Sequence, residues 1–283
     1  MSKPERITAA LDVGGTSIKA GVVRDAHVDL LPIVPSHSQG PAEVVLAQLV
    51  GALDAAITAA GPGLDDVAIA VPRPFDLDRG VPLLRGLHKF ESIHGLELPS
   101  IFRLRTAVGD RPIRFVGDAE AAGIGEARCG AGRGFRRVLT ITLGTGMGAC
   151  LTDDAQVVSA VDGLVVEDLH DRTARDARGR GRRADDAFSA RGLATALGAE
   201  TDGLESAVAD PANTARLVDF GSRLGEFLAP VLDELQAEVA VIAGGLAVVF
   251  DRFAPAIGPR ALQATLGTRG PLLGAAALTA AAH

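Results

Sequence analysis

The fold is decided by the stretch Leu11-Asp12-Val13-Gly14-Gly15-Thr16-Ser17-Ile18-Lys19-Ala20-Gly21, because this stretch has a counterpart later in the chain. The counterpart is Thr142-Leu143-Gly144-Thr145-Gly146-Met147-Gly148-Ala149. Each is an apolar run that breaks at a short turn of Gly and Thr and then resumes. The pattern predicts two β-hairpins, and glycine at their tips permits positive φ and a close approach to the backbone. Exposed N–H groups at such tips bind phosphate oxygens. The two tips therefore predict a nucleotide held between two related domains.

Composition sets limits on the class of protein. The chain has 283 residues, of which 47% are hydrophobic, so it is long enough for two domains with sizeable cores. The net charge of −7 argues against a nucleic-acid partner. All but three of the 28 basic residues are Arg, and the exceptions are Lys3, Lys19 and Lys89. The two cysteines, Cys129 and Cys150, have no metal-ligand spacing.

No targeting segment is recognised in the sequence. The first residues lack the apolar region of a signal peptide. No apolar run reaches the roughly 18 to 20 residues that a membrane span requires. We therefore expect a soluble cytoplasmic protein without a membrane partner.

Hydrophobic periodicity predicts alternating strands and helices after each hairpin, which is typical of an α/β protein with two layered domains. The segment 168–186 is polar and rich in Arg, which suits either a solvated loop or a contact with an anionic ligand. The predicted strands are 7–11, 18–23, 67–71, 113–116, 138–143, 147–152 and 239–243. The predicted helices are 42–60, 119–129, 212–236 (one helix or two), 246–256 and 272–282.

Two carboxylates follow predicted strands beside these turns. Asp12 lies at the mouth of the first glycine turn, where a carboxylate near phosphate needs an intervening cation. Asp12 is therefore either a water-mediated Mg²⁺ ligand or a residue of an Asx-type turn. Asp118 follows a strand and begins a helix, where it either caps the helix or accepts a proton from a substrate hydroxyl.

A second polar group lies further along the chain. Glu167 and His170 are three residues apart, so on one helical turn they would face the same way and either bind a polyol or form a surface pair. Asp185 and Ser189 precede a helical run and also fit an ordinary N-terminal turn of a helix.

Taken together, these motifs resemble the ROK family of sugar kinases, a branch of the actin-like ATPase superfamily with the hexokinase/Hsp70/actin fold. The match rests on four segments: the first glycine turn, Gly117-Asp118-Ala119-Glu120-Ala121-Ala122-Gly123-Ile124-Gly125-Glu126, the turn Gly144-Thr145-Gly146, and Ala243-Gly244-Gly245. The resemblance implies a two-domain α/β fold with a cleft between the domains. We expect one domain over 1–117 plus 271–283 and the other over 118–270.

The resemblance also implies the chemistry: ATP-dependent phosphorylation of a hexose hydroxyl, with Asp118 as the base. It assigns the nucleotide and Mg²⁺ to the two glycine turns and the glycine pair, and the sugar to a second set of residues. The implied nucleotide residues are Asp12, Gly14, Gly15, Thr16, Lys19, Gly144, Thr145, Gly146, Gly244 and Gly245, with Mg²⁺ at Asp12 through water. The implied sugar residues are Gly117, Glu167, His170 and Asp185. A homodimer is also expected from the family.

Several positions depart from the family pattern. The Asn that usually precedes the base is Gly117, which removes one polar contact to the sugar. Pro72-Arg73-Pro74-Phe75-Asp76 has Arg where the family has Gly. The family's zinc cluster is replaced by the Arg-rich loop 172–183, so no zinc is expected. His88 and Lys89 lie in a segment that borders the sugar in relatives, and they either contact a modified substrate or lie on the surface.

The substrate alternatives remain open at this point. Glucose, an aminosugar and a cyclitol are all candidates for the acceptor. The donor is ATP or polyphosphate, because the Arg-rich loop could suit a polyanion. A sugar sensor without catalytic activity is the alternative of a different class. Direct DNA binding is not expected, since only about ten residues precede the first motif.

Overall fold

The computed structural model describes residues 6–280, and the chain folds as two compact units. One unit comprises Met1–Gly125 with Thr268–His283, and the other comprises Glu126–Gly267. The boundaries differ from those predicted, 117/118 and 270/271. They differ because α3 (Asp118–Cys129) begins within the first unit, where Ala121 joins the same core cluster as Ala68 and Ala70.

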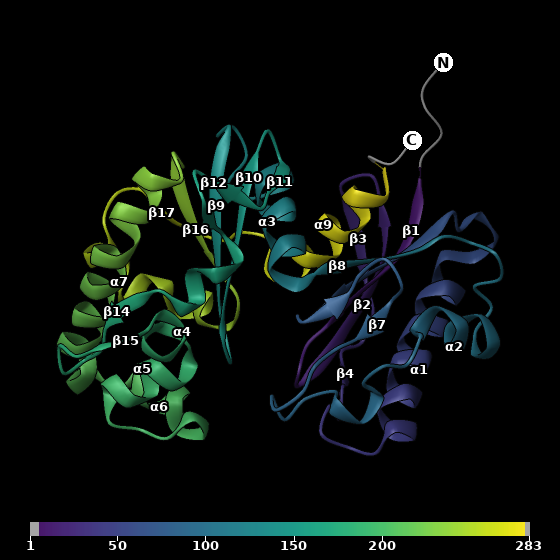
Figure 1. Ribbon diagram of the computed structural model, residues 1–283, viewed down its shortest axis with the longest axis horizontal. Coiled ribbons are helices and arrows are strands. Elements are labelled where there is room, and N and C mark those ends of the chain that lie inside the picture. Colours follow the sequence, from purple (N-terminus) through teal and green to yellow (C-terminus); the bar gives the residue numbers. More distant parts are fainter. Residues whose placement is uncertain (1–5, 281–283) are drawn as a thin grey trace. The chain divides into compact units, whose positions relative to one another are not determined.

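The sheet of the first unit has the strand order β3-β2-β1-β5-β8, and Figure 1 labels β1, β2, β3 and β8 of this sheet. The first three strands form an antiparallel meander, whereas β5 and β8 run parallel to β1. Parallel strands end at the same edge of a sheet, so the residues that follow β5 and β8 lie beside the end of β1. The strands are β1 Ile7–Val13, β2 Ser17–Arg24, β3 His27–Leu30, β4 Val34–Pro35, which pairs with β2, β5 Asp66–Val71 and β8 Ile113–Gly117.

Helices cover both faces of this sheet. Helix α1 (Ala42–Ala60) packs on β1 and β2, and α9 (Arg269–Ala280) packs on β1 and β5. The strand β5 alternates accordingly, because Ile69 joins the large core cluster with α1 whereas Ala68 and Ala70 join the cluster with α9. The unit is completed by α2 Leu98–Arg105 and the hairpin of β6 Phe75–Asp76 and β7 Val81–Pro82.

The length and apolar composition of one helix, Ala42–Gly63, would allow it to cross a membrane. This corrects the expectation that no segment reaches that length. In the structure the helix is a core element, with Val45, Leu49 and Leu53 buried against the sheet.

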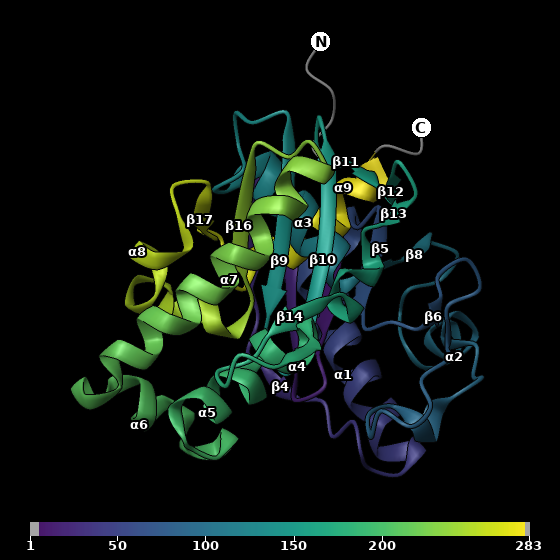
Figure 2. The ribbon, with the colours of Figure 1, turned by 60° about the vertical axis from the view of Figure 1, so that its left-hand side comes forward.

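The sheet of the second unit repeats the topology of the first. Its order is β11-β10-β9-β16-β17, again an antiparallel meander followed by two parallel strands (Figure 2). The two glycine turns therefore occupy the same place, between the first and second strand of each sheet. The strands are β9 Arg137–Leu143, β10 Met147–Asp153, β11 Gln156–Val158, β16 Val239–Ala243 and β17 Ala261–Gln263.

One face of this second sheet carries the larger core. Leu139, Ile141 and Ile242 pack there with a cluster that includes Phe188 and Phe220, whose rings meet edge to face at 5.8 Å between centroids. The helices of the unit are α4 Ala184–Phe188, α5 Ala190–Leu197, α6 Leu204–Ala209, α7 Thr214–Glu234 and α8 Ala254–Ile257.

Two predicted segments differ from the observed structure. Most of the predicted helix 246–256 is a 3₁₀ segment, Gly245–Arg252, interrupted by non-helical backbone at Val249. The Arg-rich segment contains a small hairpin, β14 (Thr173–Arg175) with β15 (Gly181–Arg183), after a 3₁₀ turn at Glu167–Asp171. A second small hairpin pairs β12 (Ala160–Val161) with β13 (Leu164–Val165).

The packing of α9 on α3 requires glycine, which generates a stability prediction. A Cβ at Gly274 would lie 1.8 Å from the backbone oxygen of Ala121. We expect Gly274→Ala to lower the free energy of unfolding by about 1–3 kcal/mol, because overpacking forces the helices apart. The matched control is Gly51→Ala in α1, where a Cβ meets nothing within 4 Å; it should raise stability by up to about 1 kcal/mol. Urea unfolding followed by circular dichroism measures both, and equal effects of the two variants would contradict the packing argument.

Candidate functional site

The first glycine turn is held by its carbonyl groups and leaves N–H groups available. The Gly14 N–H donates to the Ser17 oxygen at 2.9 Å, and the hydroxyls of Ser36 (2.8 Å) and Ser38 both donate to the Gly15 oxygen. The N–H groups of Gly15 and Thr16 have no hydrogen-bond acceptor among residues 6–280. These two donors give the turn the character of an anion site.

The second glycine turn has the same character. The Gly144 N–H donates to the Gly146 oxygen (2.9 Å), and the Gly144 oxygen accepts from the Ala190 N–H (2.7 Å). Within the described part of the chain, the N–H groups of Thr145 and Gly146 have no acceptor. The expected positive φ is absent at Gly14, Gly15, Gly144 and Gly146. The role of glycine in these two turns is therefore the absence of a Cβ, and not the adoption of a left-handed backbone.

The glycine pair after β16 lies against the second turn. Gly244 has φ +85°, and a Cβ there would lie 2.6 Å from the Leu143 oxygen. Only glycine satisfies both conditions. The structure therefore brings Gly244 and Gly245 next to the strand that leads into Gly144, as the shared parallel pairing of β9 and β16 requires.

Asp12 lies inside β1 and not in a turn, which removes the Asx-type alternative. Its carboxylate is almost fully buried and accepts from the ammonium of Lys19 at 2.7 Å, because the two residues lie opposite each other in the β1–β2 hairpin. Among the described residues, no three His, Cys, Asp or Glu side chains form a group that could hold a metal. A lone carboxylate fits Mg²⁺ that keeps most of its waters.

Asp118 begins α3, where its Oδ1 accepts from the Ala119 N–H at 2.8 Å. Solvent reaches the residue, but the protein packed around it raises the pKa of the carboxyl, and the charge of Asp12 raises that pKa further. The Ala119 N–H and the ammonium of Lys89 act on the same pKa in the opposite direction. The structure thus combines the two predicted possibilities: a residue at a helix N-terminus with the elevated pKa of a candidate base.

Gly117 makes room for an ion pair beside Asp118. Glu120 Oε2 accepts from the Gly117 N–H at 3.0 Å, and the Glu120 carboxylate accepts from Arg73 Nη2 at 3.1 and 3.2 Å. A Cβ at position 117 would lie 2.9 Å from Glu120 Oε2 and 3.1 Å from Arg73 Nε. The two departures noted in the sequence, Gly117 and Arg73, are therefore one spatial feature.

Lys89 was placed by sequence reasoning near a sugar or on the surface, and the structure brings it to the first turn. A Cβ on Gly15 would lie 3.5 Å from Lys89 Cδ, and the charge of Lys89 acts on Asp118. The sequence carried one signal for this position, the rarity of lysine. Lys19, another of the three lysines, lies at the same turn.

Glu167 and His170 share a 3₁₀ turn, but their side chains do not pair. His170 Nδ1 lies 2.6 Å from the backbone oxygen of Glu167. A carbonyl oxygen only accepts, so Nδ1 carries the proton. His170 Nε2 lies 3.5 Å from an Asp171 carboxylate oxygen.

Asp185 supports the second glycine turn. Its Oδ1 accepts from the Met147 N–H at 2.7 Å, and its Oδ2 accepts from Arg191 at 3.2 Å. The predicted contact of Asp185 with a sugar remains a prediction.

The Arg-rich hairpin borders a pocket of about 270 Å³ within the second unit. The carboxylate of Asp176 accepts from the backbone N–H groups of Arg180 and Arg178, which hold the pKa of Asp176 well below its usual range. Arginines dominate the charge of the lining, which includes Asp176, Arg178, Arg180, Arg182, Asp186 and Arg191.

Comparison with known proteins agrees with this fold. The sequence profile of the ROK family matches residues 8–281. A glucokinase of Streptomyces coelicolor is 32% identical over 142 residues, which is 50% of this chain and 42% of that protein, so the match spans less than half of the relative.

Two solved structures align over almost the whole chain. The ROK family glucokinase from Streptomyces griseus, in complex with glucose and AMPPNP, aligns with a TM-score of 0.74 at 24% identity and covers 96% of this chain and 98% of that one. The inorganic polyphosphate/ATP-glucomannokinase from Arthrobacter sp. strain KM aligns with a TM-score of 0.72 at 24% identity and covers 98% and 100%. These matches confirm the predicted actin-like ATPase fold class, and the chain belongs to the ROK family.

Proposed function

We propose that the protein transfers a phosphoryl group from ATP to a hydroxyl of a hexose or hexose-like polyol, with Asp118 as general base. The observation that carries the proposal lies within the first unit: a carboxyl of raised pKa beside an anion-binding turn and two ammonium groups. The partial identity to a glucokinase supports the same reaction class.

In the proposed reaction, the acceptor oxygen attacks the γ-phosphorus as its proton passes to Asp118. The bond from the γ-phosphorus to the β-phosphate oxygen breaks, and its electron pair leaves with ADP. A carboxyl whose pKa is raised is a stronger base when ionised, which favours proton removal near neutral pH. The N–H groups of Gly15, Thr16, Thr145 and Gly146 would donate to phosphate oxygens.

Mg²⁺, when bound, neutralises charge on the phosphates. Asp12 would hold its water shell, and Lys19 would keep the Asp12 carboxylate in place through the 2.7 Å ion pair. Gly245, where a Cβ would meet nothing within 4 Å, leaves room that suits a flat base or ribose, and Gly244 lets the chain pass close to Leu143 of β9.

The acceptor side favours a substrate other than unmodified glucose. At position 117 no side chain is present to contact a sugar hydroxyl, and the Arg73–Glu120 pair occupies the adjoining space. An aminosugar or cyclitol suits this change because a buried polar group of the substrate needs a partner. Glu167, His170 and Asp185 remain predicted sugar contacts.

Polyphosphate is a second candidate donor. The arginine-lined cavity of the second unit favours it, since guanidinium groups bind phosphate oxygens well. A catalytically inactive sugar sensor is the other alternative. We also expect, as predictions from the family, a cytoplasmic homodimer.

The first test is the base. Asp118→Asn removes the proton acceptor while preserving shape, so turnover should fall at least about a hundredfold while acceptor binding persists. ADP release, measured with ATP over a panel of hexoses, aminosugars and cyclitols, checks this; with polyphosphate as donor, formation of the phosphorylated acceptor is followed instead. The exposed Asp110→Asn in the same unit is the control and should leave turnover unchanged. A smaller loss of turnover in Asp118→Asn would overturn the assignment of Asp118 as the base. If the wild type turned over none of the substrates, the sugar-sensor alternative would be favoured.

The second test is the pH profile. The charge of Asp12 raises the pKa of Asp118, so Asp12→Asn should lower that pKa. The acidic limb of kcat/KM, which reports ionisation of the base, should then move to lower pH even where the maximal rate is reduced. Asp110→Asn again serves as the control. An acidic limb that stays in place would show that Asp118 is not the group that titrates.

The third test is the ion pair. Glu120→Ala leaves Arg73 without this carboxylate and the Gly117 N–H without its acceptor. We expect the KM of the acceptor to rise at least about tenfold with the KM of ATP unchanged. In the double variant with Arg73→Ala, the loss of acceptor-binding free energy should be smaller than the sum of the two single losses, because the two residues act as a pair. Equal changes in both KM values would contradict a role in acceptor selection.

A further inference from the structure

Lys89 has a backbone position that is tied to the first glycine turn. The Phe90 N–H donates to the Ser38 oxygen at 2.6 Å, and the hydroxyl of the same Ser38 donates to the Gly15 oxygen. Ser92 adds a second tether, from its hydroxyl to the Gly40 oxygen at 2.8 Å. The loop that carries Lys89 is therefore bonded to the segment that holds the turn.

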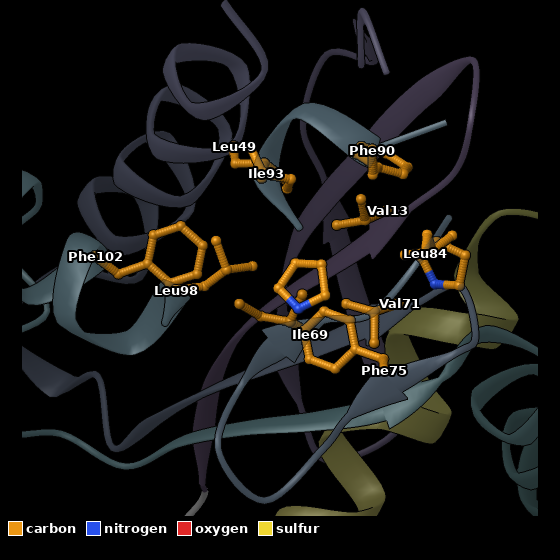
Figure 3. Close-up of a pocket in the computed structure, with 12 residues that line it drawn as sticks. Val13, Leu49, Ile69, Val71, Phe75, Leu84, Phe90, Ile93, Leu98 and Phe102 are labelled. Carbon is orange, nitrogen blue, oxygen red and sulfur yellow. The ribbon is translucent and has the colours of Figure 1, made fainter. Parts of the chain in front are cut away.

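Phe90 anchors the same loop in the core. Its side chain is 2% exposed and lines, with Val13, a small apolar cavity of about 20 Å³ (Figure 3). Val13 is the last residue of β1 and immediately precedes Gly14. His88 and Phe90 both have positive φ, and the His88 N–H donates to Glu91 Oε1 at 2.8 Å. This defined backbone fixes the place from which the Lys89 side chain extends.

The side chain of Lys89 reaches over the turn, and no ion pair with another described residue holds its charge. Its Cδ lies 3.5 Å from the position of a Cβ on Gly15. Lys19 pairs with Asp12, whereas Lys89 has no carboxylate within 4.0 Å among residues 6–280. Its charge also lowers the pKa of Asp118, so the ammonium lies within electrostatic range of that carboxyl.

Lys89 is partly buried, and the positive charge of its ammonium at a turn with two available N–H donors favours an anion. Lysine also differs from the arginines that dominate this chain, because its ammonium is a compact charge with three donors. A compact charge can follow an oxygen atom that moves during a reaction.

We propose that Lys89 is a catalytic residue whose ammonium contacts the oxygens of the phosphoryl group during its transfer to the acceptor at Asp118. The inference rests on the proposed phosphoryl transfer. Lys89 gives up no proton: the acceptor proton passes to Asp118, and the electron pair of the broken P–O bond leaves with ADP. The ammonium stabilises the negative charge on the three equatorial oxygens of the transferring group.

The test compares Lys89→Met with Lys89→Arg by steady-state kinetics, using ATP and the best acceptor found for the wild type. Lys89→Met keeps an unbranched apolar stem and removes the charge. Its kcat should fall about a hundredfold or more, with the acceptor KM within about threefold of the wild type. Lys89→Arg restores the positive charge on a side chain of different geometry. Its kcat should be at least about tenfold higher than that of Lys89→Met.

The matched control is Arg103→Met, which removes an exposed cation from α2 of the same unit and should leave kcat unchanged. Thermal unfolding of each variant, followed by circular dichroism, checks that the loop anchored by Phe90 remains folded. If Lys89 had a purely structural role, Lys89→Met would lower the melting temperature and Lys89→Arg would not restore kcat.

Each remaining outcome decides the proposal. A kcat of Lys89→Met within about threefold of the wild type overturns it. A loss confined to the acceptor KM also overturns it and assigns Lys89 to acceptor binding. A similar loss in Arg103→Met shows a general effect of charge. If the wild type phosphorylates no acceptor, the proposed function fails, and the role of Lys89 fails with it; an active wild type with a fully active Lys89→Met removes the role of Lys89 alone.

Discussion

The parallel pairing of β1 with β5 and of β5 with β8 is the constraint on which the candidate site depends. Asp12 lies in the same row of the sheet as Ala70 and Val116, so Asp118, two residues after Val116, follows at the same edge. This arrangement brings the carboxylate of Asp12 in β1 and that of Asp118 at the start of α3 within electrostatic reach. Desolvation by the surrounding protein, together with repulsion from Asp12, raises the pKa of Asp118. The edge of the sheet at which ligands commonly bind is thus also the place where the pKa of the proposed base is raised.

The same chain order, repeated in the second unit, produces from a different sequence a second glycine turn in which two N–H groups have no acceptor among residues 6–280. In both turns the carbonyl groups or flanking amides are bonded to neighbouring segments, through Ser36 and Ser38 in one and through Asp185 and Ala190 in the other. The unpaired N–H groups therefore hold fixed positions. Glycine contributes space at these tips, and left-handed backbone is used instead at Gly244, where a neighbouring strand approaches.

Much of the fold could be predicted from the sequence because it depends on local pattern. Helix 42–60 and strand 239–243 were predicted with the observed bounds, since apolar periodicity and flanking glycines define such elements. The hairpin in the Arg-rich segment was not predicted, because its pairing of Ala174 with Arg182 has no apolar alternation. The placement of Lys89 could not be predicted either, since it follows from bonds of its loop to Ser38 and Gly40, about fifty residues away.

The sequence by itself determined the two glycine hairpins, the carboxylates beside them and the family, because residue type and short spacing carry that information. Only the tertiary structure decided which charges meet. It paired Asp12 with Lys19 and directed Asp185 to the second turn. It also left Lys89 without a carboxylate among the described residues. Such contacts depend on strand register and on loops brought together by a buried core. Neither can be predicted from the residues of a single segment.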